Sequence, residues 1–492
     1  MQIENFFPLG EGQSMSDQGT KSESITIQRK ALKINLDKPK YGTFAEIGAG
    51  QEVARFFFQA GGANGTIAKS ISAYDMAYST AMYGECKRFV CEDRLNQMLD
   101  AEYDMLLKTI GPVRKQETTY FSFANTVAAK SYSYNRDFHG WLGIKFQRHP
   151  GAGASKINIH IRMLDDDRLS QAQALGIVGV NLIYAAFYHR DEPTEAIKSL
   201  AENLNNHKIE VDYVKFDGEG FEHIDNRILC LELVRNKLTN AVMFDPKLGV
   251  IQPAEALYKK SVLVQRGSFR PLTHVNIDMM ENALAQFIQE DAVKGTEVFP
   301  LMEITLANLL ANGDLNLQDF LARVDILMAL GYSVLISNYV EFYRLNSYFA
   351  NYTKNPIGIA MGIKNIRDIF QEEYYKDLEG GIMESFGKLF SKNVRLYVYP
   401  ELSADGKTLI KIQNFKAPDA LEHLFGFLLD RKHIVGIKGF NKDYLTIFSR
   451  DVLVMIGVGS TDWFNMVPPT VAKLICERGY FDWPKEAKQQ VT

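Results

Sequence analysis

The sequence predicts an α/β protein with an α+β N-terminal half and a C-terminal half in which strands and helices alternate. The chain has 492 residues, which is too long for one ordinary hydrophobic core and indicates more than one domain. Apolar residues make up 46% of the chain and charged residues 23%, as in globular proteins. After about residue 255, apolar runs of strand length alternate with segments of helical periodicity. This alternation predicts a parallel sheet with crossover helices, either open or closed into a partial (β/α) barrel.

Four segments are predicted along the chain. Residues 1–28 are polar and rich in Ser, Gly and Gln, so they are expected to be a flexible tail. Residues 29–254 are expected to form the α+β domain, and residues 255–465 the α/β domain. Residues 466–492 are expected to cap the fold, because Pro468 and Pro469 can open a helix that ends before a glycine.

The N-terminal half is predicted to begin with helices and to continue with strands. Residues 92–109 have apolar side chains at three- and four-residue steps, which is the pattern of an amphipathic helix. Two more helices are expected at 51–58 and 67–82, near a cluster of glycines. Strands are expected at 119–124, 141–147, 156–164, 178–188, 209–215, 228–234 and 240–244, with helices between them at 169–175 and 194–205.

The C-terminal half is predicted to alternate between the two kinds of element. Its strands are nearly continuous apolar runs, as expected when helices cover both faces of a sheet. The expected strands are 262–264, 273–277, 298–304, 333–337, 357–361 and 395–399. The expected helices are 279–290, 317–330, 340–353, 365–374, 378–390 and 421–431.

Charge and cysteine content narrow the functional class. The net charge is −4 and the pI is near 6.2, which argues against a dedicated nucleic-acid-binding protein. The N-terminus lacks a secretory signal and no run of membrane-spanning length is apolar, so a cytoplasmic protein without a membrane span is expected. The four cysteines are few and scattered, as in a reducing compartment. Cys86 and Cys91 do not have the spacing of a zinc pair, and no metal site is predicted.

The most distinctive segment is 44–76, in which glycines stand next to polar and charged residues. Such glycines can point backbone N–H groups at an anion, or they can pack a tight turn between helices. Neither GxGxxG nor the P-loop GxxxxGK[ST] is present. Glu46, Glu52 and Asp75 lie in the same segment and could serve as general bases or metal ligands, but surface solvation or a salt bridge to Arg55 or Lys69 is the favoured interpretation. The predicted ligand-contacting residues are Gly48, Gly50, Gly61, Gly62, Gly65 and Lys69.

A second group of candidates precedes and follows the first strand of the C-terminal half. Lys259, Lys260, Arg266 and Arg270 flank a Gly-Ser loop and are predicted to bind a phosphate or carboxylate. The alternative is a solvated surface loop.

Polar residues at the ends of the predicted parallel strands form the best chemical constellation. Ligands of open parallel sheets and barrels bind outside the carboxyl ends of the strands. Glu303 ends an otherwise apolar strand, so we predict that it is the catalytic acid or base, with Asn338 as an orienting group. Other candidates at strand ends are Ser337, Gly362, Lys364 and Glu401. His139 suits proton transfer, but a packed or surface histidine is the favoured interpretation.

Several runs resemble a widespread bacterial family of cytoplasmic proteins of about this length. They include YGTFAEIGAGQEVARFFF, GGANGTIAKSISAYDM, RGSFRP and MVPP, and the resemblance covers nearly all of the chain after the tail. Members of that family carry automated names such as TonB-dependent receptor or nicotinate-nucleotide adenylyltransferase. The first name implies export and outer-membrane strands, and the second implies an HxGH-type nucleotide motif; this sequence shows neither. The resemblance therefore implies no activity and no catalytic residue.

The residues together favour a cytoplasmic enzyme that acts on a phosphorylated or nucleotide-like small molecule. The alternative is a non-enzymatic protein that self-assembles or binds a partner. That alternative rests on the aromatic stripe of Phe342, Tyr343, Tyr348, Phe349 and Tyr352, for which core packing is the simpler explanation.

Overall fold

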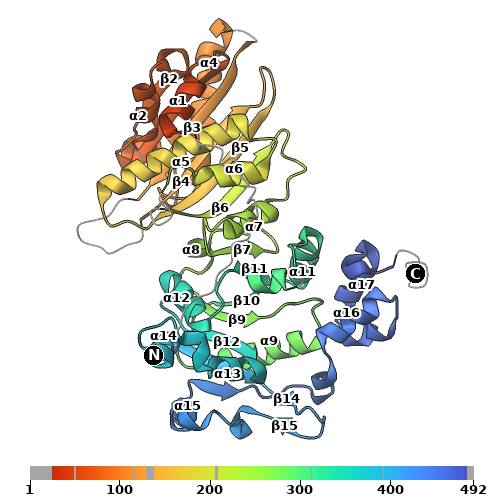
Figure 1. The fold of residues 1–492 in the computed structure, drawn as a ribbon. Coiled ribbons are helices and arrows are strands. Elements are labelled where there is room, and N and C mark those ends of the chain that lie inside the picture. The colour runs from red at the N-terminus through yellow and green to blue at the C-terminus, as the bar shows by residue number, and fades with distance from the viewer. Residues whose placement is uncertain are drawn as a thin grey trace, which may run out of the picture.

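The computed structural model describes residues 25–48, 51–114, 117–128, 138–204, 209–311, 313–391 and 393–484. It confirms the α/β class: two large sheets, each with helices packed on both faces, lie one above the other in Figure 1. Residues 1–24 of the predicted tail and residues 485–492 of the predicted cap lie outside the described ranges. Within the predicted tail, Ile27 already begins the first helix.

The first sheet has six strands in the order β2-β1-β3-β4-β5-β6. Strands β1, β2 and β3 are parallel to one another, and β4, β5 and β6 continue the sheet in antiparallel fashion. The strands are β1 Lys40–Gly48, β2 Ile67–Ile71, β3 Thr119–Val127, β4 Phe138–Gln147, β5 Ala154–Met163 and β6 Ile209–Gly218.

Helices cover both faces of this sheet. On one face, Phe44, Phe121 and Phe123 share a buried core with α1, α2 and α5, and α6 packs on α5. On the other face, α4 packs through Leu95 and Leu99. The helices are α1 Ile27–Asn35, α2 Val53–Ala60, α3 Met76–Tyr83, α4 Glu92–Arg114, α5 Arg168–Tyr188 and α6 Pro193–Leu200.

The second sheet has eight strands in the order β16-β13-β12-β9-β10-β11-β7-β8. From β9 the chain adds β10 and β11 on one side, then returns to add β12, β13 and β16 on the other, all of them parallel. This is an open, doubly wound sheet, and the partial barrel is not formed. The strands are β7 Ala241–Asp245, β8 Gly249–Ile251, β9 Ser261–Arg266, β10 Val298–Thr305, β11 Ser333–Ser337, β12 Ile357–Gly362, β13 Val394–Tyr399 and β16 Ile434–Gly436.

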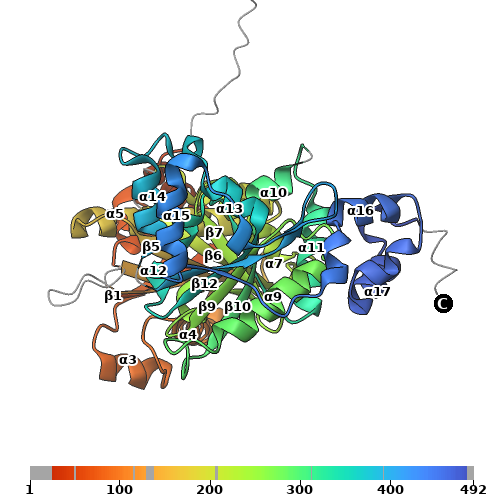
Figure 2. The ribbon, with the colours of Figure 1, turned by 90° about the horizontal axis from the view of Figure 1, so that it is seen from below.

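The helices of the second half are divided between the two faces of its sheet (Figure 2). Helices α9 and α11 share the core that continues from the first half, whereas α12, α13, α14 and α15 bury the opposite face. Helices α16 and α17 close the fold beside α11. The helices are α7 Asn226–Arg235, α8 Pro253–Ala256, α9 His274–Phe287, α10 Leu306–Leu310, α11 Leu317–Ala329, α12 Phe342–Tyr352, α13 Ile363–Ile369, α14 Gly381–Leu389, α15 Glu422–Asp430, α16 Ser449–Gly457 and α17 Pro469–Arg478, and a small ribbon joins β14 Glu401–Leu402 to β15 Leu409–Ile410.

The chain passes from one sheet to the other between β6 and β7. Strand β7 pairs antiparallel with β11, and β8 extends the same edge, so residues 241–251 belong to the second sheet. The predicted division at residue 254 places these strands with the first half. Helix α7 packs on both β6 and β7 and carries one continuous core across the change of sheet.

Four predicted elements are wrong. The run 273–277, predicted as a strand, is the N-cap and first turn of helix α9. The runs 178–188 and 228–234, predicted as strands, lie in helices α5 and α7. Both are buried on most sides, so their apolar composition lacks the one-sided pattern that distinguishes a helix from a strand. The predicted helix 67–82 divides into the short strand β2 and helix α3.

Helix α5 is long and apolar enough to cross a membrane by length and composition. About 72% of its most apolar window is buried inside the protein, as in the core helix of a folded domain. It is the single helix of this kind among the described residues.

Candidate functional site

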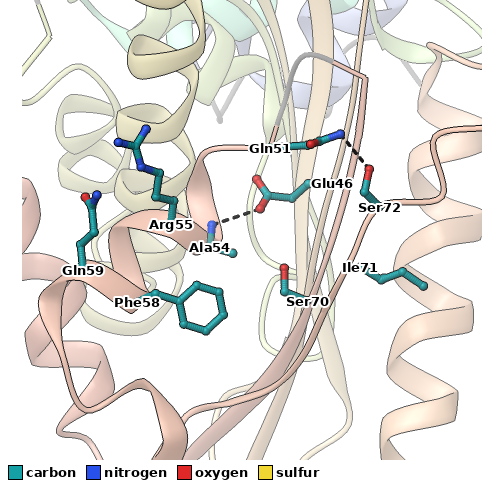
Figure 3. A pocket seen from close by; sticks show the side chains of 9 residues that line it. All are labelled: Glu46, Gln51, Ala54, Arg55, Phe58, Gln59, Ser70, Ile71 and Ser72. Carbon is teal, nitrogen blue, oxygen red and sulfur yellow. Dashed lines mark hydrogen bonds between the residues drawn. The ribbon is translucent and has the colours of Figure 1, made fainter.

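A cavity of about 510 Å³ lies in the glycine-rich segment, between helix α2 and the end of strand β2 (Figure 3). Its walls combine one buried acid, one guanidinium, one phenyl ring and several amide and hydroxyl groups. We call it the Glu46 pocket. It is lined by Glu46, Gln51, Ala54, Arg55, Phe58, Gln59, Ser70, Ile71 and Ser72.

The local sequence brings these side chains together. Strand β1 carries Glu46 near its carboxyl end, and the chain then turns at Gly48, where φ is +79°. A Cβ at Gly48 would lie 2.1 Å from the Val127 carbonyl oxygen of β3, so this turn requires glycine. Helix α2 follows, and Phe58 lies on the same side as Ala54 and Arg55 because it comes four and three residues after them, about one helical turn.

Glu46 is the central group of the pocket. One carboxylate oxygen accepts the Val53 N–H at 2.9 Å and the Asn125 side-chain N–H at 3.2 Å, and the other accepts the Ala54 N–H at 3.1 Å. Val53 and Ala54 are the first two residues of α2, whose free N–H groups and dipole favour an acid here. Burial nevertheless raises the pKa of Glu46 to about 7, and the nearby charge of Glu52 adds to the effect.

The rim of the pocket offers groups suited to an anionic, planar ligand. The Arg55 guanidinium is paired with Glu52 at 2.9 Å and remains largely exposed. Phe58 presents its ring to solvent. Gln51 donates to the Ser72 hydroxyl at 2.8 Å across the cavity. Guanidinium groups bind phosphate and carboxylate, and aromatic faces stack on planar rings.

None of the predicted ligand-contacting residues is among the described residues that line this pocket; Gly48 forms the turn before α2, and Gly50 lies outside the described residues. Gly61 and Gly62 end α2 with positive φ, and Gly65 lies in the short turn Ala63–Gly65. These three glycines are absent from the pocket walls. Lys69 points to the opposite face of the sheet, where it pairs with Glu102 at 2.7 Å.

The three acids of the glycine-rich segment, Glu46, Glu52 and Asp75, lie in different surroundings. Glu46 lines the pocket, whereas Glu52 pairs with Arg55. Asp75 caps helix α3 by accepting the Tyr78 N–H at 2.8 Å. The sequence alone gave no means of choosing among the three.

The predicted catalytic pair of the second half consists of a buried, ion-paired acid and an exposed asparagine. Glu303 is fully buried and accepts two bonds from the Arg266 guanidinium, at 2.8 and 2.9 Å, and one from the Ser337 hydroxyl at 2.6 Å. With both oxygens engaged by a cation, Glu303 positions Arg266 and is poorly placed to move a proton. Asn338 is exposed, and its backbone N–H donates to the Asn240 carbonyl. The position beside Glu303 that was predicted for Asn338 is occupied by Ser337.

The four predicted anion-binding cations do not meet. Arg266 lines a cavity of about 160 Å³ together with Phe342, Asn365 and Tyr375. Arg270 pairs with Asp319 at 2.6 Å. Lys259 and Lys260 precede β9, and Lys260 pairs with Glu297 at 2.8 Å. A six-residue strand, roughly 20 Å long, separates the lysines from Arg266.

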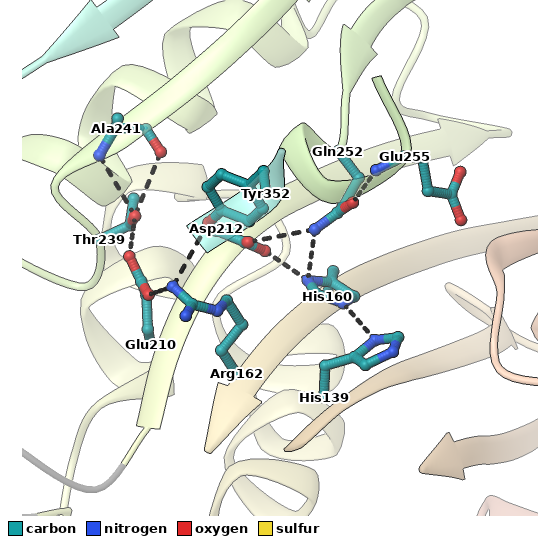
Figure 4. Close-up of polar contacts among 10 residues, drawn as sticks. All are labelled: His139, His160, Arg162, Glu210, Asp212, Thr239, Ala241, Gln252, Glu255 and Tyr352. Atoms are coloured by element: carbon teal, nitrogen blue, oxygen red, sulfur yellow. Dashed lines mark hydrogen bonds and ion pairs between the residues drawn. The ribbon is translucent and has the colours of Figure 1, made fainter. Parts of the chain in front are cut away.

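Asp212, His160 and His139 form a row of contacting titratable side chains, of which the sequence predicts only His139 as a candidate (Figure 4). Asp212 contacts His160 at 2.5 Å through Nδ1, and His160 Nε2 lies 3.0 Å from His139 Nδ1. Burial lowers the pKa of His139 to about 4, and the nearby His160 adds to the effect. For His139 the sequence favours a packed or surface histidine, and the structure places it half-buried. The alternation of Asn158, His160 and Arg162 along β5 was the one available signal.

The three side chains Asp212, His160 and His139 lie where the two halves of the protein meet. Arg162 pairs with Glu210 at 2.8 Å and contacts the Tyr352 hydroxyl of α12 at 3.3 Å. Gln252, just before α8, approaches Asp212 at 3.4 Å. These contacts join strands of the first sheet to elements of the second half. We call the group the seam cluster; it consists of His139, His160, Arg162, Glu210, Asp212, Gln252 and Tyr352.

Comparison with known proteins yields only distant likeness. No family model and no curated protein matches the chain. Among solved structures, a competence/damage inducible protein CihA from Agrobacterium tumefaciens is 16% identical, with a TM-score of 0.25, over 32% of this chain and 94% of that one. A nicotinic acid mononucleotide adenylyltransferase from Plasmodium falciparum is 11% identical, with a TM-score of 0.29, over 46% of this chain and 99% of that one. A CinA-superfamily protein from Enterobacter cloacae is 12% identical, with a TM-score of 0.25, over 37% of this chain and 99% of that one.

Proposed function

We propose that this chain is a cytoplasmic enzyme that acts on a phosphorylated or nucleotide-like small molecule held in the Glu46 pocket. The observation that carries the proposal is a buried carboxyl, with a pKa near neutrality, in the wall of a cavity large enough for such a ligand.

The rim groups match the parts of such a molecule. Arg55 uses one N–H group on Glu52, and a guanidinium has five, so the remainder can bind a phosphate. The exposed ring of Phe58 can stack on a base. Ser70 and Gln59 supply hydrogen bonds for sugar hydroxyls.

Glu46 supplies the chemistry. With its pKa at about 7, both its protonated and ionised forms are populated at neutral pH. The ionised form can take a proton from a water or a ligand hydroxyl, and the protonated form can return it to a leaving group. The bonds from the Val53 and Ala54 N–H groups fix the carboxyl in place for both steps.

We expect Arg55→Ala to weaken binding of a phosphorylated ligand by roughly 10- to 100-fold, because a charge-assisted hydrogen bond contributes about 1.5–3 kcal/mol. The measurement is a thermal-shift titration against nucleotides and sugar phosphates. Arg344→Ala is the matched control, since its side chain is 54% exposed and paired with Glu341, as Arg55 is 58% exposed and paired with Glu52. Stabilisation by none of these ligands would contradict the proposal.

In the same titration, Phe58→Ala distinguishes nucleotides from sugar phosphates. Loss of the ring should weaken binding of nucleotides more than that of sugar phosphates, because a planar base makes the larger stacking contact with the ring. Phe427→Ala is the control, with a ring 51% exposed compared with 55% for Phe58.

We expect Glu46→Gln to bind the ligand and to lower its turnover by about 10²- to 10⁴-fold, the usual contribution of a general acid or base. The amide keeps the size of the side chain but cannot exchange a proton with the ligand. The measurement is the kcat of wild type and variant on any ligand from the titration that is converted. Equal turnover in the two proteins would remove Glu46 from the mechanism.

The alternative of a self-assembling or partner-binding protein loses its original support. All five members of the aromatic stripe lie on α12 and are buried in the core that this helix covers. They are Phe342, Tyr343, Tyr348, Phe349 and Tyr352. Self-assembly stays a prediction, to be checked by light scattering at high protein concentration.

A further inference from the structure

We propose that Cys86 and Cys91 form a reversible disulfide, which makes the loop between α3 and α4 a site of thiol oxidation. The two sulfur atoms lie 3.5 Å apart, and both cysteines are free thiols. The other two cysteines, Cys230 and Cys476, are buried elsewhere in the fold.

The loop already holds the two side chains face to face. Both thiols donate to the same acceptor, the Arg88 carbonyl oxygen, at 2.8 Å from Cys86 and 3.1 Å from Cys91. A disulfide bond is about 2.05 Å long, so the sulfurs need to approach by about 1.5 Å. Rotation of the two side chains can supply most of that approach without a change of fold.

The environments of the two thiols assign their roles. Cys86 is half-buried and can meet an oxidant from solvent. Cys91 is buried beside the N-terminus of α4, where its sulfur accepts the Arg94 N–H at 3.4 Å. Burial raises the pKa of Cys91 to about 11, which favours Cys86 as the thiol that reacts first.

The ligand set favours dithiol chemistry over a metal site. Among the residues that the structure describes, no group of three His, Cys, Asp or Glu side chains is placed to hold a metal ion. Two thiols without a third ligand are a poor zinc site, but they suffice for a disulfide.

The reaction is an exchange with a low-molecular-weight disulfide such as oxidised glutathione. The Cys86 thiolate attacks one sulfur of that disulfide, forms a mixed disulfide and releases one glutathione thiolate. Cys91, as a thiolate, then attacks the Cys86 sulfur and releases the second glutathione thiolate. The protein loses two protons and two electrons, and the oxidised glutathione becomes two reduced molecules.

Closure of the bond would alter a contact between the two halves. The ends of the loop are fixed, since Arg94 donates to the Gly84 carbonyl at 2.8 Å and Thr126 donates to the Phe89 carbonyl at 2.6 Å. Between them, the Arg88 guanidinium lies 5.3 Å from the centre of the Tyr258 ring, in the segment before β9. A disulfide removes both thiol bonds to the Arg88 carbonyl, so we expect the backbone that carries this contact to adjust.

The test treats the folded full-length protein with oxidised glutathione and maps its peptides without reduction. The expected product joins Cys86 to Cys91 with loss of two hydrogens, carries no glutathione, and reverts with dithiothreitol. Cys230 and Cys476 should stay reduced, and they serve as internal controls because both are buried. No reaction at Cys86, or a glutathione adduct on Cys86 that never closes, would overturn the proposal.

Two variants test the order of events. Cys91→Ser should accumulate glutathione on Cys86, because the second thiol is missing. Cys86→Ser should acquire no glutathione, because Cys91 is buried. A glutathione adduct on Cys91 in the second variant would reverse the assigned roles and contradict this mechanism. The wild-type peptide map decides the disulfide itself even if either variant fails to fold.

Discussion

At the scale of single residues, the partner of a buried acid decides what that acid can do. Glu46 and Glu303 are both buried at the carboxyl ends of parallel strands. Glu303 meets the Arg266 guanidinium, whose charge offsets its own. Glu46 meets only neutral N–H donors, so burial shifts its pKa upward. The sequence shows two acids at strand ends, but not which one has a cation beside it.

The pH dependence of stability follows from that shift. The pKa of Glu46 is about 7 in the folded protein and near 4.5 when unfolded, so between these values only the folded state keeps the proton. Protonated Glu46 therefore makes its full contribution to the free energy of unfolding below about pH 4.5. That contribution is lost as the pH rises through 7. Because glutamine cannot ionise, Glu46→Gln should equal wild type near pH 4.5 and exceed it above pH 7, by up to about 3 kcal/mol.

Urea unfolding of wild type and variant at a series of pH values measures this difference. Glu195→Gln, at an exposed glutamate of α6, is the control and should show no such divergence. A constant difference between wild type and Glu46→Gln at every pH would mean that Glu46 keeps an ordinary pKa.

At the scale of elements, the sequence predicts that strands and helices alternate. It predicts less well whether a fully buried apolar run is a strand or a helix. Residues 333–337 were predicted as a strand and form β11 with the same bounds. Helices α5 and α7 were predicted in part as strands, because Val, Ile and Leu follow one another there without a polar face. The glycine-rich segment, singled out from its composition, contains the Glu46 pocket. The seam cluster was not predicted, because His160 and Asp212 are 52 positions apart and meet only through the pairing of β5 with β6.

The Arg266–Glu303 pair ties three strands of the second sheet together. Arg266 ends β9, Glu303 lies on β10, and the Ser337 hydroxyl donates from the end of β11. We expect Glu303→Ala to destabilise the protein by about 3–5 kcal/mol, because Arg266 would be left with an uncompensated charge. Ligand affinity in the Glu46 pocket should not change, since that pocket lies in the other sheet.

Chemical denaturation measures the first effect and the thermal-shift titration the second. Glu401→Ala is a suitable control, because its pair with Arg367 is more exposed and should contribute less than about 1 kcal/mol. Loss of turnover in Glu303→Ala with unchanged stability would restore Glu303 as a catalytic residue.

At the scale of the whole molecule, the two halves share a continuous core and the seam cluster. We expect Asp212→Ala to weaken their coupling, because His160 loses its buried acceptor and the polar groups around it lose a partner. Calorimetry should then show two separated transitions, or one at a lower temperature than that of wild type. Asp451→Ala, at an exposed position of α16, is the control. One transition at the wild-type temperature would show that the cluster does not couple the halves.

The pairing of β7 and β8 with β11 determines how this protein can be divided. A fragment that begins at residue 255 lacks β7 and β8, so β11 becomes an edge strand with its backbone groups unpaired. All five residues of β11 are buried in the intact chain, and such an exposed edge is a template for aggregation. A fragment that begins near residue 240 keeps β7 and β8 as a natural cover for that edge.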